Sequence, residues 1–336
     1  MPQQQSHFSN SAVRVVGAGI AGTWQALLFA QAGCDVVLYE RGGNASEGTS
    51  HWAGGMLAPY CEAESAEPVI TRLGLRSLEL WREVLPETVL NGTLVVAHAR
   101  DAADFDRFGR LTDRHRRLDA EEIEELEPDL AGRFHRALFF ADEGHVEPRQ
   151  VLPALHQRLR AAGVPIVFNR ATDPDELDGT VIDCRGLAAR DACRDLRGVK
   201  GETVLVETAD IQLSRPVRLI HPRWPLYIIP RADNRFLIGA STIESEDTGV
   251  SVRSALELLS AAVTVHPAFL EARIVEVGAG LRPAFPDNLP RIAAGNRRIS
   301  VNGLYRHGFL IAPALAEATV THVLEGRTDP EVIRCA

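Results

Sequence analysis

The chain has 336 residues, of which 45% are hydrophobic and 24% charged, an ordinary globular composition with room for two domains. Its net charge of −9 argues against a nucleic-acid partner, because phosphate binding depends on clustered Lys and Arg. No run of about 18 apolar residues is present, so no membrane span is expected. Five cysteines without a CxxC pair and a polar start without an apolar signal stretch favour the cytoplasm, with residues 1–10 as a flexible tail.

A β-α-β unit is predicted first. Two apolar runs rich in β-branched residues, Ala12 to Val16 and Asp35 to Tyr39, are typical of buried parallel strands. A helical segment from Thr23 to Ala32 joins them, and Gly33 ends it. This order of elements is the usual beginning of a nucleotide-binding fold.

The turn between the first strand and the helix carries the spacing G-x-G-x-x-G at Gly17, Gly19 and Gly22. The first glycine permits the tight turn, the second lets the backbone approach a pyrophosphate, and the third allows close packing of helix on strand. The helix N-terminus offers N–H groups and positive potential to phosphates. Glu40, which follows the second strand, is suited to the adenosine ribose hydroxyls. The fingerprint predicts a dinucleotide without distinguishing NAD from FAD.

A Gly-rich, irregular loop is expected from Gly42 to Tyr60, followed by an amphipathic helix from Val69 to Val84. Within the loop, Gly48 to Met56 combines small residues with hydroxyls, which suits a backbone lying along a ribityl chain and a flavin ring. Trp52 and Met56 favour burial of this stretch rather than a surface loop. The loop therefore favours FAD.

The rest of the chain alternates between helices and strands. Further helices are predicted at Ala102 to Leu118, Ala120 to Glu127, Pro148 to Ala162, Val252 to Val265 and Phe309 to Leu324. Further strands are predicted at Gly92 to Ala97, Ala137 to Phe140, Pro165 to Phe168, Thr180 to Asp183, Glu202 to Glu207, Pro216 to Ile220, Leu226 to Arg231, Arg235 to Ala240, Arg273 to Val277 and Arg298 to Val301.

The last strand, loop and helix again look like part of a parallel α/β layer, so the nucleotide domain is expected to be discontinuous. We expect an α/β protein with a Rossmann-like FAD-binding domain and a mixed or antiparallel β-sheet domain for substrate. The FAD-binding domain is assigned residues 11–90, 143–201 and 283–336. The substrate-binding domain is assigned residues 91–142 and 202–282.

Six motifs occur in one order along roughly residues 13 to 325, and the combination is far more specific than any one of them. They are the glycine fingerprint with Glu40, TSHWAGGML at 49–57, GHVEP at 144–148, YIIPR at 227–231, GLRP at 280–283 and YRHGFLIAPA at 305–314. The series resembles the D-amino-acid-oxidase family of flavoproteins, and most of all its glycine-oxidase branch, which serves thiamine biosynthesis.

The resemblance implies non-covalent FAD, since no cysteine lies near Arg282 to tether a flavin. Its cofactor contacts would be Gly17, Gly19, Ile20, Ala21, Gly22, Glu40, Arg41, Thr49, Ser50, Gly54, Gly55, Met56, Gly186, Arg306, His307, Gly308, Phe309 and Leu310. For the substrate, Arg282 would grip the carboxylate with Tyr227 beside it, and Arg306 and Met56 would lie nearby.

The chemistry fits these roles. An Arg fork binds a carboxylate through paired charge-assisted hydrogen bonds, and a fixed carboxylate places the α-carbon over the flavin. The neutral amine can then expel a hydride to the flavin without a dedicated general base. The helix beginning near Phe309 would stabilise negative charge on the reduced ring. Gly280 and Pro283 are read as a constrained turn around Arg282.

The implied activity is FAD-dependent oxidation of glycine, or of a small amine such as sarcosine, to the imine and glyoxylate, with oxygen as acceptor and release of hydrogen peroxide. Two alternatives stay open: a broader D-amino-acid or secondary-amine oxidase, and a flavin dehydrogenase subunit that passes electrons to a partner. Departures at Cys184-Arg185-Gly186, Trp52 and Tyr305 bear on substrate specificity. The histidines lack ligand spacing, so no metal is expected, and a homo-oligomer is left open.

Overall fold

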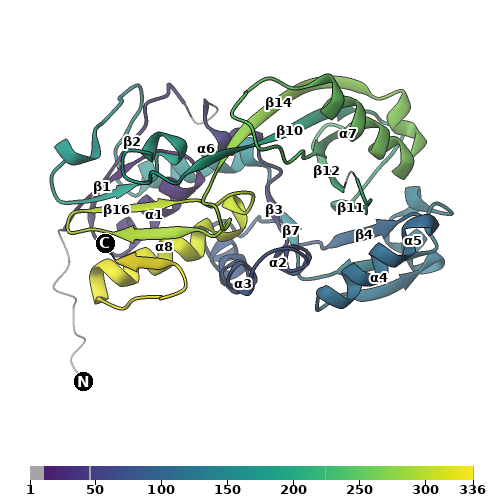
Figure 1. Cartoon of the computed structure of the whole chain (residues 1–336), viewed down its shortest axis with the longest axis horizontal. Coiled ribbons are helices and arrows are strands. Elements are labelled where there is room, and N and C mark those ends of the chain that lie inside the picture. Colours follow the sequence, from purple (N-terminus) through teal and green to yellow (C-terminus); the bar gives the residue numbers. More distant parts are fainter. Residues whose placement is uncertain (1–10, 45–46, 224, 336) are drawn as a thin grey trace. The chain divides into compact units, whose positions relative to one another are not determined.

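The computed structural model describes residues 11–44, 47–223 and 225–335, and the expected tail, residues 1–10, lies outside them. The chain divides into two compact units (Figure 1). Unit 1 comprises Met1–Ala53, Pro148–Val199 and Arg282–Ala336, and unit 2 comprises Gly54–Glu147 and Lys200–Leu281. The chain therefore passes from one unit to the other four times.

Unit 1 is built on a seven-stranded sheet with the order β17-β15-β16-β9-β1-β2-β8. The run from β16 to β8 is parallel, and β1 lies between β9 and β2. Its strands are β1 (Ala12–Val16), β2 (Asp35–Tyr39), β8 (Ile166–Val167), β9 (Thr180–Asp183), β15 (Arg291–Ala294), β16 (Arg298–Asn302) and β17 (Ile333–Cys335). Most β-branched residues of the two predicted parallel strands are buried, with Val13 and Val15 fully excluded from solvent and Val37 partly buried.

Helix α1 (Ile20–Gln31) packs against α8 (Gly308–Glu325) and α6 (Pro148–Ala161). It is apolar on all sides, as expected of a buried helix, and Trp24 and Phe29 are fully buried. Gly33 ends it with a φ of +85°, a conformation that favours glycine. A buried hydrogen bond of 3.0 Å from Gln25 Nε2 to Thr319 Oγ1 ties α1 to α8.

Unit 2 is built on an eight-stranded sheet with the order β14-β10-β13-β12-β11-β4-β6-β5 and a two-stranded ribbon, β3-β7. From β10 through β13 and β12 to β11 neighbouring strands pair antiparallel, as they do from β4 through β6 to β5, whereas β11 and β4 are parallel. The large sheet comprises β4 (Thr93–Ala97), β5 (Arg116–Asp119), β6 (Arg136–Phe140), β10 (Arg197–Glu207), β11 (Val217–Ile220), β12 (Leu226–Arg231), β13 (Arg235–Gly239) and β14 (Arg273–Ala284). The ribbon is β3 (Met56–Leu57) with β7 (Gly144–His145).

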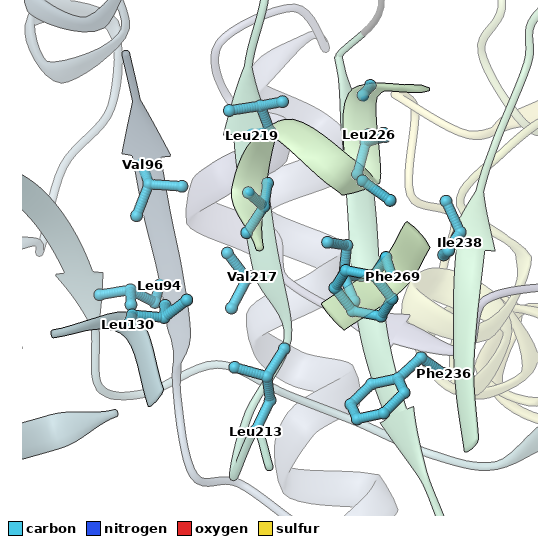
Figure 2. Packing of buried hydrophobic residues seen from close by; sticks show 14 of the residues in the cluster. Leu94, Val96, Leu130, Leu213, Val217, Leu219, Leu226, Phe236, Ile238 and Phe269 are labelled. Carbon is cyan, nitrogen blue, oxygen red and sulfur yellow. The ribbon is translucent and has the colours of Figure 1, made fainter. Parts of the chain in front are cut away.

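Both faces of the large sheet carry apolar clusters. On one face, side chains of β4, β11, β12 and β13 meet residues of α5 (Ala120–Leu126), α7 (Val252–Val265) and Phe269. Figure 2 shows side chains of the four strands together with Phe269. Adjacent strand residues point to opposite faces, so Val95 belongs to a second cluster while Leu94 and Val96 belong to the first. The second cluster is formed with α2 (Pro59–Glu62) and α4 (Ala102–Leu111). Helix α3 (Pro68–Val84) packs on α2.

Two predicted elements are wrong. The helix expected from Ala102 to Leu118 ends at Leu111, and 116–119 form the strand β5. This strand is the edge of the sheet, and only Leu118 in it is buried. Its mostly polar sequence is therefore similar to that of a solvent-exposed helix. The turn expected at Gly280 to Pro283 is the end of β14, which runs on to Ala284.

The sequence-based domain boundaries differ from the units at residues 54–90, 143–147 and 200–201, which belong to unit 2, and at Arg282, which belongs to unit 1. The cause is pairing between distant segments. β3 pairs with β7, and the Glu143 carboxylate accepts backbone hydrogen bonds from Tyr60 and Cys61. None of the helices built from described residues has the length and hydropathy that crossing a bilayer requires.

Candidate active site

The glycine fingerprint closes the tight turn between β1 and α1. Gly17 has a φ of +103°, and a Cβ there would lie 2.5 Å from the Cys184 carbonyl oxygen. A Cβ on Gly22 would lie 1.9 Å from the Gly17 carbonyl oxygen. Only glycine fits either position, because α1 starts in direct contact with the ends of β1 and β9. The turn thus has the shape that the fingerprint predicts.

Two side chains hold this turn. The Glu40 carboxylate accepts from the Ala18 amide at 2.7 Å and from the Gly42 amide at 2.9 Å, which places it beside the fingerprint at the end of β2. Ser50 Oγ accepts from the Ile20 amide at 3.1 Å. Ser50 belongs to a short 3₁₀ turn, Thr49–Trp52, whereas Arg41 and Thr49 are exposed.

The start of α1 fits a dinucleotide. The first hydrogen bond at this helix start runs from the Thr23 amide to Gly19, and the Ala21 and Gly22 amides meet no acceptor in the described part of the chain. Donors of this kind at a helix N-terminus bind phosphate oxygens. The glycine cradle supplies the close approach, and Glu40 supplies acceptors for a ribose, so the residues present fit the adenosine diphosphate half of FAD.

His156 supports the same turn from α6. Its Nε2 lies 3.1 Å from the Ala18 carbonyl oxygen and 3.0 Å from Thr23 Oγ1. Burial lowers the pKa of His156, which keeps the ring neutral. Since a carbonyl can only accept, the contact with Ala18 requires Nε2 to carry the proton.

A buried charge cluster holds the turn after β9. Asp183 is fully buried and binds both Arg185 and Arg298, with its shortest contact, to Arg298, at 2.6 Å. Both arginines also contact Asp191, and they lower the pKa of that carboxyl to about 2 although partial burial opposes the shift. The cluster fixes the Cys184-Arg185-Gly186 turn, in which Gly186 has a φ of +58°.

The proposed carboxylate ligand and the start of α8 lie close together in unit 1. The Tyr305 amide donates to the Pro283 carbonyl at 3.0 Å, so Arg282 and Arg306 each adjoin a residue of this hydrogen-bonded pair. Arg282 is half-buried and Arg306 exposed. His307 occupies the N-cap position of α8 and is buried, and the Gly308 and Leu310 amides meet no acceptor among the described residues. The helix start therefore retains free donors for an anionic group.

In unit 2, Arg231 holds the predicted flavin segment. It donates to the Gly54 carbonyl at 2.6 Å and to the Val146 carbonyl at 3.3 Å, and its Nε lies 2.5 Å from a Glu147 oxygen. The Gly55 carbonyl accepts from the Val146 amide. These bonds fix the backbone of Gly54 and Gly55 directly before Met56.

Tyr227, also in unit 2, lies directly opposite Arg218 in the β11-β12 ladder. The Arg218 Nη1 donates to the Tyr227 hydroxyl at 3.0 Å, and the guanidinium lies 5.3 Å from the centre of the tyrosine ring. Burial raises the pKa of Tyr227 well above its ordinary value, although the charge of Arg218 opposes the shift. The phenol therefore stays protonated.

His145 lies opposite Met56 in the β3-β7 ribbon. Burial, and then the nearby Arg231 charge, lower the pKa of His145 to about 4, so the ring is neutral near pH 7. Within residues 11–44, 47–223 and 225–335, no three His, Cys, Asp or Glu side chains gather as a metal site. The cysteines Cys34, Cys61, Cys184 and Cys193 are free thiols.

The predicted site residues are thus divided between the units. Unit 1 brings together the fingerprint, Glu40 and Ser50, and separately the Arg282 and Arg306 segments. Unit 2 contains Gly54, Gly55, Met56 and Tyr227. The sequence analysis did not identify Arg218, Arg231 or the Asp183 cluster as residues that support the predicted site. An arginine inside the apolar run Pro216 to Ile220 was the signal for Arg218.

Comparison with known proteins agrees with this geometry. A family model described as DAO, FAD dependent oxidoreductase, matches residues 12–321. The chain is 50% identical over 321 residues to the putative thiamine biosynthesis oxidoreductase ThiO of Rhizobium etli, a match that covers 95% of this chain and 98% of that protein. It is 28% identical over 342 residues to the glycine oxidase of Geobacillus kaustophilus, covering 90% and 89%.

A solved structure shows the same fold. The crystal structure of glycine oxidase from Geobacillus kaustophilus matches with a TM-score of 0.79 and 25% identity over 96% of each chain. The family match spans the fingerprint, the Arg231 segment and most of α8, and the start of α1 fits the cofactor that the family uses. The chain therefore belongs to the DAO family and is an FAD-dependent oxidoreductase.

Proposed function

We propose that this enzyme oxidises glycine, and small amines such as sarcosine, with oxygen as the electron acceptor, in thiamine biosynthesis. One observation carries the proposal: a glycine oxidase shares the fold over 96% of both chains at 25% identity. The 50% identity to a protein named for thiamine biosynthesis supports the pathway. In total, glycine, oxygen and water would give glyoxylate, ammonia and hydrogen peroxide.

The proposed roles follow from the charge and the donors of each residue. Arg282 binds the substrate carboxylate through its planar fork, and Tyr227 donates a hydrogen bond to the same group. Arg306 adds positive charge near the substrate, and Met56 limits its size. The fixed carboxylate holds the α-carbon in position, and FAD, when bound, would supply the hydride acceptor. No general base is assigned, because a neutral amine needs none.

The remaining cofactor contacts are proposed at both ends of FAD. Ile20, Ala21, Glu40 and Arg41 bind the adenosine diphosphate half. Thr49, Ser50, Gly54, Gly55 and Gly186 lie along the flavin half. The amides of Gly308, Phe309 and Leu310, at the positive end of α8, stabilise negative charge on the ring, with Arg306 and His307 beside them.

Anaerobic bleaching of the yellow protein by a panel of amino acids tests the substrate. We expect glycine and sarcosine to reduce the flavin with higher kcat/KM than bulky D-amino acids. Preference for D-phenylalanine or D-proline would instead identify a broader D-amino-acid oxidase on the same fold.

Oxygen consumption by the isolated protein tests the acceptor. Peroxide formed in step with glycine loss supports an oxidase, whereas flavin that glycine bleaches and oxygen does not reoxidise would indicate a dehydrogenase subunit. Cytoplasmic location and homo-oligomerisation are further expectations, which cell fractionation and light scattering test.

A further inference from the structure

Arg218 is held rigidly on its own side of the sheet. Besides Tyr227, it donates to the Cys61 carbonyl at 3.2 Å and to Glu64 at 3.3 Å, and it lies 3.8 Å from a Glu62 oxygen. Its guanidinium lies 4.9 Å from the centre of the Phe108 ring, and its side chain is only 7% exposed. With this many partners, the guanidinium has one available orientation.

The charge of Arg218 is already matched. Glu62 and Glu64 provide two carboxylates within 4 Å, so this arginine presents no excess positive charge to a substrate anion. Its influence on the site therefore passes through the hydrogen bond to Tyr227. That bond joins residues that are direct neighbours across two strands, so its geometry is set by the sheet register.

The hydroxyl of Tyr227 has one proton to donate and lone pairs to accept. Arg218 occupies a lone pair, and no described residue accepts the phenolic proton. Tyr227 is partly exposed whereas Arg218 is buried. The pair can therefore contact a ligand through the phenolic proton of Tyr227, which Arg218 leaves unused. Because the guanidinium can only donate, the proton must point away from it.

We propose that Arg218 is a positioning residue for the substrate carboxylate: by donating to the Tyr227 oxygen, it directs the Tyr227 proton toward that carboxylate. The inference rests on the proposed function to the extent that Tyr227 contacts the substrate. It assigns to Arg218 orientation of a donor rather than binding of the anion, which remains the role of Arg282.

A double-mutant cycle tests the proposal in the FAD-loaded enzyme, with Arg218→Lys, Tyr227→Phe and the combined variant. Acetate is the probe, titrated through the flavin absorbance spectrum, with glycine kinetics measured in parallel. A lysine keeps the charge, but a single ammonium group cannot reproduce the hydrogen bonds that Arg218 donates to Cys61, Glu64 and Tyr227. Loss of one hydrogen bond to a charged group predicts a rise of about tenfold in the acetate Kd and in the glycine KM for each single variant, with a smaller change in kcat.

The coupling between the two substitutions in acetate binding distinguishes a residue that orients Tyr227 from one that only stabilises the fold. If Arg218 acts through Tyr227, Arg218→Lys changes the acetate Kd less than about twofold in the Tyr227→Phe background. If Arg218→Lys weakens acetate binding equally in both backgrounds, Arg218 only stabilises α2 and the proposal is overturned. A Tyr227→Phe variant that binds acetate as tightly as the unaltered enzyme would also overturn it, a result that does not depend on how Arg218→Lys folds.

Arg215→Lys is the matched control, because Arg215 is also an arginine paired with a buried carboxylate, Glu127, in the same unit. It should lower the melting temperature without changing acetate binding. The two proposals fail separately. Enzyme that binds acetate with the expected coupling but does not oxidise glycine contradicts the proposed function alone, and glycine oxidation with additive variants contradicts the role of Arg218 alone.

Discussion

Glu143 is a fully buried carboxyl in unit 2. Its Oε1 accepts from the Tyr60 and Cys61 amides, while its Oε2 has no partner among the described residues. Burial raises the pKa of Glu143 to about 7, against the lowering effect of these bonds. Because the folded-state pKa exceeds the ordinary value of 4.5, the contribution of Glu143 to stability is complete below about pH 4.5 and is lost as the pH rises through 7.

Glu143→Gln should remove this pH dependence, since an amide keeps an acceptor for both backbone groups and cannot ionise. Between about pH 5 and 8 the variant should gain up to about 3 kcal/mol of unfolding free energy relative to the unaltered protein. Urea unfolding of both proteins across this range measures the difference, in which the opposite contribution of His145 cancels. A difference that stays constant with pH would contradict the prediction.

Arg282→Leu should leave FAD bound and the protein folded while lowering kcat/KM for glycine. Losing one charged partner of a desolvated pair predicts a fall of roughly 30- to several-thousand-fold, and Arg282→Lys should recover part of it because a point charge lacks the planar fork. Flavin content, melting temperature and kinetics are measured on one preparation. Arg291→Leu, which removes partly exposed ion pairs in the same unit, is the control. Activity that falls only in proportion to folded protein would make Arg282 structural.

The contacts of single functional residues could be predicted where the residues lie close together in the sequence. The fingerprint glycines and Glu40 lie within one β-α-β unit, so their contacts follow from sequence order. Arg218 could not be assigned in this way, because its partner is set by the register of β11 on β12 and its anchors, Glu62 and Glu64, come from more than 150 residues earlier.

At the scale of elements, hydrophobic periodicity placed the well-buried ones accurately. β1, β2, β12 and α7 have the predicted bounds. The failures occur where burial is one-sided or absent. β5 is an exposed edge with one buried residue. β14 was predicted only as far as Val277, because glycine and proline at 278–283 favour a turn, yet the strand continues to Ala284. The short strand β17 pairs with β15, about 40 residues earlier in the chain, and no local pattern reveals that partner.

Arg231→Met should loosen the segment Gly54 to Met56 by removing the hydrogen bonds to the Gly54 and Val146 carbonyls. Loss of these bonds to a charged group should weaken FAD binding by about tenfold or more, while the sheet stays intact. Flavin fluorescence on dilution measures the dissociation constant.

The control is Arg235→Met in the adjacent strand, where the ion pair with Glu207 is exposed enough to contribute little. FAD affinity that falls equally in both variants would show a general loss of stability, and unchanged affinity in Arg231→Met would show that the segment does not need its arginine.

For the whole molecule, we predict that FAD is held without a covalent bond. Cys184, the cysteine at the fingerprint, is a poor nucleophile because burial raises the pKa of its thiol well above the ordinary value. Acid precipitation should release all of the yellow chromophore, and mass spectrometry of the supernatant should show FAD. Flavin that stays on the denatured chain would contradict this.

The discontinuous architecture was predictable because the last strand and helix carry an α/β pattern like that of the first. The boundaries at residues 54–90 and 143–147 were not, because β3 and β7 form a ribbon only through contacts between segments almost 90 residues apart. Long-range pairing of this kind leaves no local trace in the sequence.

The fourfold crossing of the chain between units has a consequence for biosynthesis. A ribosome completes unit 2 at Leu281, before the segment Arg282–Ala336 that supplies β15, β16, β17 and α8 to unit 1. At about 5–20 residues per second, these 55 residues take roughly 3–11 s to translate. Meanwhile β9 has an open edge and α1 lacks its partner helix, although the fingerprint was synthesised first. We therefore expect the nascent chain to need protection from aggregation at this stage.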